Sequence, residues 1–407
     1  MNWLSQILVV AGFGLRTIPQ RKGAALTAAI GIAGVVAVFV GVLSIAQGFH
    51  RAVTSTGRED IAIILREGSN NEMSSGLSRD EVRLIKDAPG VARASGEALA
   101  SAELFVIIDI AKRSTGTDAN VPLRGVESTA SALRGNIQLV SGRMFERGRN
   151  EIVAGVAAAR EFAGLDVGST LKLGRMEWEV VGLFSDGGGV GESELWTDAT
   201  TLQDAYQRGD TYQSVYVRLE SPESFNEFKD ALTSNPQLKV RVERQGDFYA
   251  EQSSMTTSFI ASIGTVIAVM MALGALLGDE VLDLRVLARL GALSTVYNAV
   301  AGRSREIATL RALGFGATPV VCSVLMESVV LALAGGIVGG IGAYLAFDGY
   351  SAATMNFQTW SQIAFAFAVT PELLVNAIIL AVIIGLIGGF FPAIRAARLP
   401  IATALRG

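Results

Sequence analysis

The 407-residue sequence contains one cysteine, Cys322, and one histidine, His50. A single cysteine excludes an internal disulfide framework, and the two residues together are too few for a transition-metal site of the usual His/Cys kind. The same scarcity excludes the common pairing of a nucleophile with a histidine base. The sequence also lacks the pattern G-x-x-x-x-G-K-[ST], which excludes nucleotide binding by a P-loop on this chain. We therefore expect neither catalytic residues nor a metal site.

Charged residues are few and nearly balanced. They make up 18% of the chain, and 34 basic and 38 acidic residues give a formal net charge of -4. This balance gives no indication of a nucleic-acid partner. Hydrophobic residues make up 50%, and the mean hydropathy is +0.41. Such a composition predicts membrane segments, and the length allows more than one domain.

Four apolar stretches are long enough to cross a hydrocarbon core, which takes about 20 residues of helix. They are residues 23–49, 259–278, 320–347 and 373–394. Glu327 is the only acidic or basic residue within them, and we interpret it as an interfacial helix end. The first stretch follows basic residues, as a secretory signal does, but it exceeds the roughly 7–15 residues of a signal core. We therefore expect it to be a transmembrane helix.

The basic residues predict the orientation of these helices, because Lys and Arg close to span ends stay in the cytoplasm. Residues 348–372 contain no Lys or Arg. The basic residues near the span ends are Arg16, Arg21, Lys22, Arg303, Arg305, Arg311, Arg395, Arg398 and Arg406. We predict that residues 1–22, 279–319 and 395–407 are cytoplasmic, which places both termini inside. Residues 50–258 and 348–372 are then external.

The long external segment predicts a mixed α and β domain. Strand-like runs occupy residues 61–65, 103–110, 151–153, 170–173, 178–183, 212–219 and 238–243. A capping box at Ser78–Glu81 begins one helix, and residues 222–234 are typical of another. We expect an α+β domain with two lobes that divide near residues 140–150. The predicted fold class is an α-helical membrane protein with four transmembrane helices and this large extracytoplasmic α+β domain between the first and second.

Glycines are prominent in two further places. Asp186–Gly191 is a glycine-rich run, but no Lys-Ser/Thr follows it, so we expect a mobile hairpin tip and not a phosphate loop. Pairs at four-residue spacing lie within the spans, and such pairs allow close approach of helices in lipid. They are Gly274 with Gly278, Gly335 with Gly339, and Gly336 with Gly340.

The segment between the second and third spans carries the most specific pattern. Residues 297–316 read YNAVAGRSREIATLRALGFG. As a helix this segment is basic and amphipathic, and a membrane anchor would explain the charge alone. The order of its residues, however, resembles the R-x-R-E-I-A-x-L-R-A-L-G pattern of the FtsX/MacB-type permeases of ABC transporters, a family related to LolC/LolE. The matching residues are Arg303, Arg305, Glu306, Ile307, Ala308, Leu310, Arg311, Ala312, Leu313 and Gly314.

The resemblance extends to the end of the chain, where residues 392–406 are similar to the family's ending, and to the layout of one span, a large external domain and three spans. It implies a periplasmic MacB-like domain and a dimer, with itself or a related permease, in the lipid of the bacterial inner membrane. A cytoplasmic ABC ATPase subunit would be a separate polypeptide that binds ATP and Mg²⁺, while this chain binds no cofactor. A periplasmic adaptor protein is a further candidate partner.

The resemblance also implies which residues couple the permease to the ATPase, because the inner loop of the family docks there. That role falls to Arg303, Arg305, Glu306, Leu310, Arg311 and Gly314. One departure affects it: residues 279–291, DEVLDLRVLARLG, interrupt the family's usual passage from the second span into this loop. As a helix the insert would displace the loop by about 20 Å at 1.5 Å per residue.

Three functions remain open from the sequence. The first is ATPase-driven export or extraction of a substrate, of the efflux or lipoprotein-release type. The second is a non-transporting, FtsX-like scaffold that uses mechanotransmission to control an extracytoplasmic hydrolase. The third is a membrane-anchored sensor, which would leave the loop and the C-terminal pattern unexplained.

Overall fold

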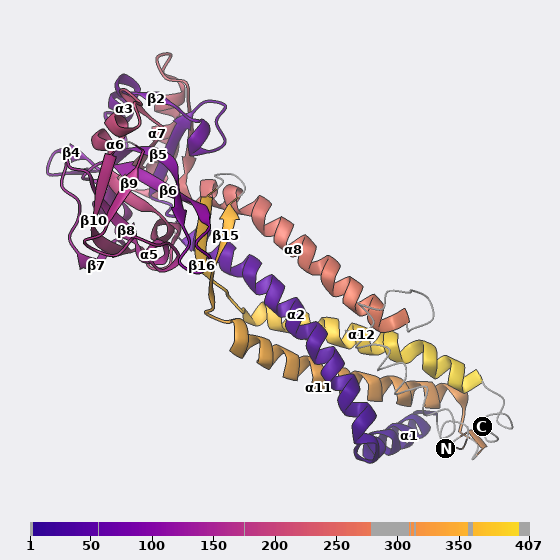
Figure 1. Ribbon diagram of the computed structural model, residues 1–407. Coiled ribbons are helices and arrows are strands. Elements are labelled where there is room, and N and C mark those ends of the chain that lie inside the picture. Colours follow the sequence, from indigo (N-terminus) through magenta and orange to yellow (C-terminus); the bar gives the residue numbers. More distant parts are fainter. Residues whose placement is uncertain are drawn as a thin grey trace. The chain divides into compact units, whose positions relative to one another are not determined.

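The computed structural model describes residues 3–55, 57–174, 176–277, 309, 311–312, 315–356 and 361–398. The chain divides into two compact units, each described here by itself. The helical unit comprises residues 1–47, 259–350 and 368–407, and the mixed unit comprises residues 48–258 and 351–367. Figure 1 shows the long helices and the strands that distinguish the two units.

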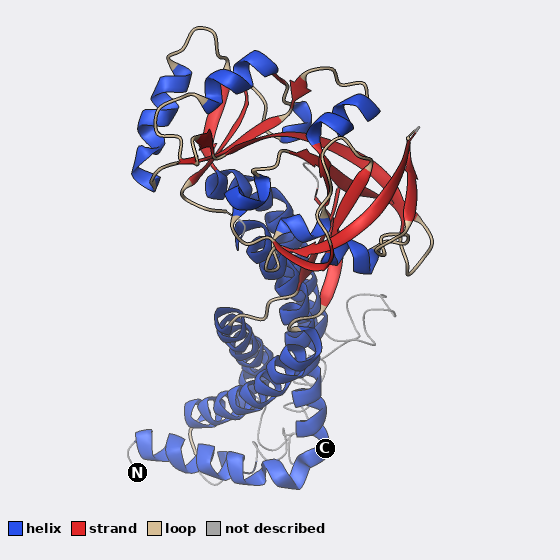
Figure 2. Cartoon of the chain, turned by 90° about the vertical axis from the view of Figure 1, so that its left-hand side faces the viewer, coloured by secondary structure: helices blue, strands red, loops and turns tan. Residues whose placement is uncertain are grey.

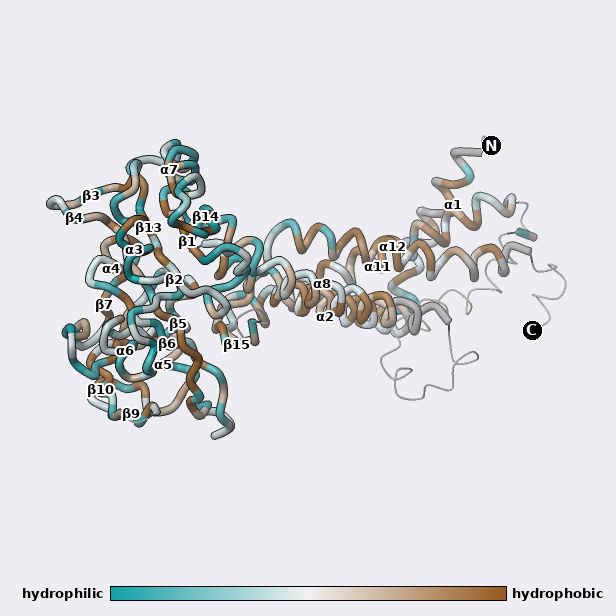
Figure 3. The backbone as a smooth tube through the Cα atoms, turned by 90° about the horizontal axis from the view of Figure 1, so that it is seen from above, coloured by the Kyte–Doolittle hydropathy of each residue, from teal (hydrophilic) through white to brown (hydrophobic). Residues whose placement is uncertain are grey.

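Long helices dominate the helical unit. It contains α1 (Trp3–Thr17), the short η1 (Ile18–Arg21), α11 (Ala317–Phe347) and α12 (Pro371–Arg398). It also contains the larger parts of α2 (Lys22–Ser55) and α8 (Gln245–Leu277), whose other ends belong to the mixed unit. Four of the described helices are long and apolar enough to cross a membrane, over Ala25–Ser55, Gln245–Met271, Ala317–Phe347 and Pro371–Phe390. Hydrophobic residues follow one another along them (Figure 3).

Small and branched apolar side chains form the interior of the helical unit. The buried residues come from α2, α11 and α12 and from the segment just before α12: Ala28, Ile32, Val35, Val36, Val40, Ala332, Ala343, Val369, Leu373, Ala377, Ala381 and Ile384. Met271 of α8 packs against this core. A lipid solvent gives apolar side chains no reason to leave it, so close van der Waals packing has to hold such helices together.

The mixed unit contains all the described strands (Figure 2). Its main sheet has the order β14-β1-β13-β5-β6-β11-β8-β10-β7, with β9 paired to β10. The strands of this sheet are β1 (Ile61–Arg66), β5 (Ala100–Ala111), β6 (Asp118–Val126), β7 (Gln138–Gly142), β8 (Glu151–Gly155), β9 (Thr170–Leu173), β10 (Met176–Ser185), β11 (Leu195–Asp198), β13 (Ser214–Arg218) and β14 (Val240–Arg244).

Short strands and helices complete the unit. The strands are β2 (Leu77–Ser78), β3 (Arg93–Ala94), β4 (Glu97–Ala98) and β12 (Thr211–Tyr212). The helices are η2 (Glu72–Ser74), α3 (Arg79–Lys86), α4 (Ala130–Arg134), α5 (Val156–Glu161), η3 (Val190–Ser193), α6 (Ala199–Ala205), η4 (Pro222–Ser224) and α7 (Phe225–Thr233). The predicted capping box is present, since the Ser78 hydroxyl accepts from the Glu81 N–H and the Glu81 carboxylate accepts from the Ser78 N–H. The fold class predicted from the sequence is confirmed.

Two large hydrophobic cores pack against the main sheet, beside a smaller one that contains Phe184 and Trp196. The first gathers residues from both ends of the domain, within 62–102 and 199–242, whereas the second gathers residues within 104–202. The predicted division near residues 140–150 is therefore wrong. The reason lies in the strand order, because β1 pairs with β13 and β14 at the far end of the domain sequence. The long hairpin of β5 and β6 then carries the chain into the second core.

The segment between the third and fourth spans forms a hairpin in the mixed unit. Strands β15 (Ser351–Asn356) and β16 (Ser361–Ala366) pair in antiparallel register from Ser351↔Ala366 to Asn356↔Ser361. Ile363 and Phe365 of β16 are buried, as is expected for a strand with one covered face. The two helices on either side, α11 and α12, belong to the helical unit.

Candidate functional site

Most residues of the predicted coupling loop lie outside the described part of the chain. These are Arg303, Arg305, Glu306, Leu310 and Gly314, together with Gly278 and the 279–291 insert. Arg311 is described and half-buried. Gly274 lies in α8, but its surroundings are also outside the description. The sites that the structure does describe are the helix contacts, the outer hairpin and the interior of the mixed unit.

The predicted glycine pair of the third span packs against the first span. A Cβ on Gly335 would lie 2.5 Å from the Ala29 carbonyl oxygen and 3.0 Å from the Ile32 Cβ. A Cβ on Gly339 would lie 2.8 Å from the Ala33 Cα. Real Cβ atoms do not approach other atoms so closely, so only glycine allows α11 to lie this close to α2.

The neighbouring face of α11 packs in the same way against α12. A Cβ on Gly336 would lie 2.9 Å from the Ala381 Cβ, and a Cβ on Gly385 would lie 2.5 Å from the Ala332 Cβ. Glu327 is buried in this unit at 8% exposure, and its expected position at a membrane interface stays a prediction. Helix α11 therefore packs closely against both neighbours through glycine contacts.

The outer hairpin is held on two sides within the mixed unit. The Ser193 hydroxyl accepts from the Ala364 N–H at 2.9 Å and donates to the Ala364 carbonyl at 3.3 Å. On the other side, the Phe49 and Phe365 rings meet edge to face, with centroids 5.6 Å apart. Gly48 lies against the backbone of β16, where any Cβ would collide with it. The hairpin is thus clamped between η3 and the end of α2.

The glycine-rich run Asp186–Gly191 leads from β10 into η3 and is mostly buried, and the mobility expected from the sequence stays a prediction. Only Gly187 and Gly188 are exposed, and Asp186 is 7% exposed. The Glu192 carboxylate folds the run into a compact loop, because one of its oxygens accepts from the Ser185 hydroxyl and from the Asp186 and Gly188 N–H groups. These hydrogen bonds to Glu192 fold the loop back on itself and so bury most of it.

A buried ionic cluster occupies the interior of the mixed unit. Arg124 of β6 donates to Glu72 at 2.7 and 3.0 Å, to Glu194 at 2.8 Å through two nitrogens, and to Glu103 at 3.0 Å. Arg134 of α4 donates to Glu103 at 2.7 Å. Because the guanidinium of Arg124 is planar and carries five N–H donors, it can donate to three carboxylates at once.

The electrostatic environment of the cluster keeps its glutamate ionised and its tyrosine neutral. Burial opposes ionisation of Glu72, but the charge and hydrogen bonds of Arg124 outweigh burial, so the pKa of Glu72 lies below its usual range. Glu72 also accepts from the Ser214 hydroxyl at 2.6 Å and the Tyr216 hydroxyl at 3.2 Å. Burial raises the pKa of Tyr216 well above its usual value. Tyr216 approaches Tyr249 of α8 at 3.4 Å, so the cluster extends to the helix that continues as the second span.

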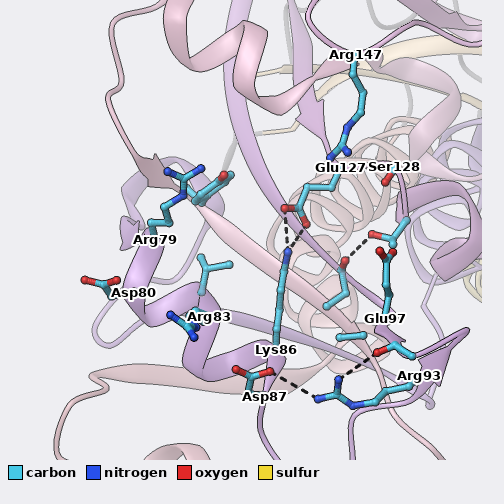
Figure 4. A pocket seen from close by; sticks show the side chains of 16 residues that line it. Arg79, Asp80, Arg83, Lys86, Asp87, Arg93, Glu97, Glu127, Ser128 and Arg147 are labelled. Atoms are coloured by element: carbon cyan, nitrogen blue, oxygen red, sulfur yellow. Dashed lines mark hydrogen bonds and ion pairs between the residues drawn. The ribbon is translucent and has the colours of Figure 1, made fainter.

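An open polar groove of about 800 Å³ lies beside α3 (Figure 4). Lys86 reaches across it to the Glu127 carboxylate at 2.6 and 2.8 Å, and Arg93 lies 3.7 Å from Asp87. The other charged lining residues are Arg79, Asp80, Arg83, Glu97 and Arg147. Basic and acidic side chains nearly balance here, so the groove favours neither anions nor cations. Among the residues described, no group of three His, Cys, Asp or Glu side chains is placed to hold a metal ion.

Sequence reasoning missed the hairpin and the cluster, although each has a signal. In β16 the apolar Ile363 and Phe365 alternate with Gln362 and Ala364, which is the period of a strand. The cluster residues are single charges inside otherwise apolar strands, such as Arg124 in Val121–Val126. A charge at such a position has to be paired, but nothing in the sequence says with which residue.

Comparison with known proteins gives two matches to family models. The model of the MacB-like periplasmic core domain matches residues 25–235, and that of the FtsX-like permease C-terminal domain matches residues 285–401. The resemblance predicted from the sequence is confirmed.

Individual relatives are distant. A Bdellovibrio bacteriovorus macrolide export ATP-binding/permease protein MacB is 22% identical over 425 residues, which cover 97% of this chain and 61% of that protein. The chain thus spans less than two thirds of that relative. An uncharacterized ABC transporter permease of Methanocaldococcus jannaschii is 22% identical over 405 residues, which cover 97% of each chain. The solved periplasmic region of MacB from Actinobacillus actinomycetemcomitans is 13% identical with a TM-score of 0.38, over 49% of this chain and 95% of that one.

Proposed function

Since the chain belongs to the family that joins a MacB-like periplasmic core domain to an FtsX-like permease domain, we propose that it is the permease subunit of an ABC transporter. It works as a dimer, with itself or a related permease, in the bacterial inner membrane, with both termini in the cytoplasm. A separate cytoplasmic ATPase subunit binds ATP and Mg²⁺, and its hydrolysis cycle moves the mixed unit on the periplasmic side.

One observation carries this proposal. The boundaries between the units fall inside α2, at residue 48, and inside α8, at residue 259. The outer hairpin, whose ends continue as α11 and α12, also belongs to the mixed unit. All four candidate spans are therefore joined to the mixed unit by unbroken helix or by a clamped hairpin. Such connections suit a protein that passes movement along its helices.

The output of that movement is export or extraction of a substrate, as in efflux or lipoprotein release, with a periplasmic adaptor as partner. The Bdellovibrio relative is named as a macrolide export protein, and this supports export. The input is the loop that precedes α11, where Arg303, Arg305, Glu306, Leu310, Arg311 and Gly314 contact the ATPase. In that region the basic side chains would meet the partner as charge-assisted contacts.

The test is affinity purification of the tagged chain from its native membrane in mild detergent, followed by mass spectrometry and an ATPase assay of the eluate. We expect a P-loop ATPase to co-purify, and Arg305→Glu with Arg311→Glu to reduce its recovery at least tenfold, since two attractive contacts become repulsive at about 1.4 kcal/mol per factor of ten. A matched control reverses two exposed arginines of the mixed unit, Arg160→Glu and Arg208→Glu, and should leave recovery unchanged. Purification without any ATPase would overturn the proposal.

A further inference from the structure

The loop beside the outer hairpin contains a buried carboxyl group that the proposed function does not use. Asp186 is 7% exposed, and its Oδ2 has no hydrogen-bond partner among the described residues. That oxygen faces Gly191 of η3, where an added Cβ would lie only 2.8 Å away. A buried carboxylate oxygen without a donor is costly when it is charged, and much less so when it carries a proton.

Asp186 and the hairpin clasp are parts of one short segment. From Asp186 the chain passes through the loop to η3, whose last residue is Ser193. Ser193 is 1% exposed and makes both hydrogen bonds to Ala364 of β16. The loop is fixed in between by the Asp186 carbonyl, which accepts from the Gly189 N–H at 3.3 Å. Asp186 is therefore joined by a short, hydrogen-bonded loop to the residue that holds the hairpin.

The charged groups that face Asp186 come from three neighbouring segments. Arg134 of α4 favours ionisation of Asp186, as does the nearby Gly191 N–H, while the carboxylates of Glu194 and of Glu192 in η3 oppose it. Burial is the largest influence, and it raises the pKa of Asp186 to about 6. The positive charge of Arg134 is already shared with Glu103 at 2.7 Å.

We propose that Asp186 is a proton-binding site that controls the clasp between η3 and the outer hairpin. With the proton bound, Asp186 is neutral, the repulsion from Glu192 and Glu194 is removed, and Ser193 holds Ala364. With the proton released, the buried charge strains the loop and loosens the clasp. The inference deepens the proposed function, on which it rests, by naming a regulator of the path from the spans to the mixed unit.

The sign of the pH dependence follows from the direction of the shift. The closed loop binds the proton more tightly than an open, solvated loop, where an Asp titrates near its ordinary value of 3.8. The closed state is thus favoured as the pH falls, and this advantage is lost as the pH rises through about 6. The clasp should be tight on the acid side of this value and loose on the alkaline side.

Hydrogen exchange of the full-length chain in detergent micelles tests the inference. Protection factors are measured at about pH 5 and about pH 7.5, because they correct for the dependence of intrinsic exchange rates on pH. We expect protection of residues 361–366 to be about tenfold higher at the lower pH, because each pKa unit corresponds to a factor of ten. Asp186→Asn, which is neutral at both values, should keep the high protection at both. Residues 61–66 of β1 report the global fold and should not change.

Two further variants make the outcome decisive. Asp118→Asn removes an exposed carboxyl of the same unit and should respond to pH as the wild type does. Ser193→Ala removes the clasp itself and should lower protection of residues 361–366 at both pH values. Equal protection at both pH values in the wild type, or a pH response that persists in Asp186→Asn, would overturn the inference. No ATPase is needed here, so this result and the result of the co-purification can fail independently.

Discussion

Arg124 illustrates what a single side chain does in the interior of the mixed unit. It is 2% exposed, and it is the shared partner of Glu72, Glu103 and Glu194. Each of these carboxylates would be unfavourable at its position without a positive charge nearby, and none of them can reach bulk water. The four residues come from η2, β5, β6 and the position just before β11, so one guanidinium links parts of the unit that are distant in sequence.

Replacement of this side chain should therefore destabilise the mixed unit strongly. We expect Arg124→Met to lower the free energy of unfolding by about 3–5 kcal/mol, because it leaves buried Glu72 and Glu194 without their counter-charge. Glu103 would keep only its ion pair with Arg134. The measurement is urea or thermal unfolding of the full-length protein in detergent. Arg113→Met is the matched control, since Arg113 makes an exposed ion pair with Asp166 at 2.9 Å and such pairs contribute about 0–1 kcal/mol. Equal losses for the two variants would refute the interpretation.

Helices and strands differ in how far the sequence alone predicted them. The strand-like runs at 61–65, 103–110 and 178–183 were found because each combines β-branched residues with a clear boundary, and β1, β5 and β10 include them. Hairpin β15–β16 was missed because Ala352 and Ala353 in its first strand are too small to give a strand pattern. The division between the two large cores was predicted at the wrong place, because local periodicity does not reveal which distant strands pair.

The glycine contacts of α11 give a prediction about helix packing. Gly339→Leu should lower the thermal midpoint of the protein in detergent, because its Cβ would already lie 2.8 Å from the Ala33 Cα. Overpacking of this kind costs about 1–3 kcal/mol. Gly342→Leu, three residues further along the same helix, has no atom within 4 Å of an added Cβ and is the control. A midpoint for Gly339→Leu equal to that of Gly342→Leu would show that the α11–α2 contact is loose.

The chain as a whole joins spans and mixed unit through continuous helices, and this gives a prediction about coupling. Gln47 is exposed and lies at the unit boundary within α2. Gln47→Pro removes a helical hydrogen bond and costs about 3 kcal/mol or more, while Gln47→Ala preserves the helix. We expect the proline variant to retain ATPase binding but to lose ATP-dependent change in the distance between spin labels on the mixed unit and the helical unit. An ATP-dependent distance change in Gln47→Pro as large as that of the wild type would show that α2 does not transmit the movement.

The position of β1 beside β14 has a consequence for how such a chain can be altered. These strands are the first and last of the main sheet in sequence, and they pair from Ala62↔Arg244 to Arg66↔Val240. The chain therefore enters and leaves the domain at the same sheet edge, next to the helices that continue into the first and second spans. A segment with adjoining ends can be exchanged as a cassette without rebuilding its host. A hybrid permease would therefore exchange residues 48–258, and the outer hairpin of residues 351–367 would be exchanged with them because it is bonded to the same unit.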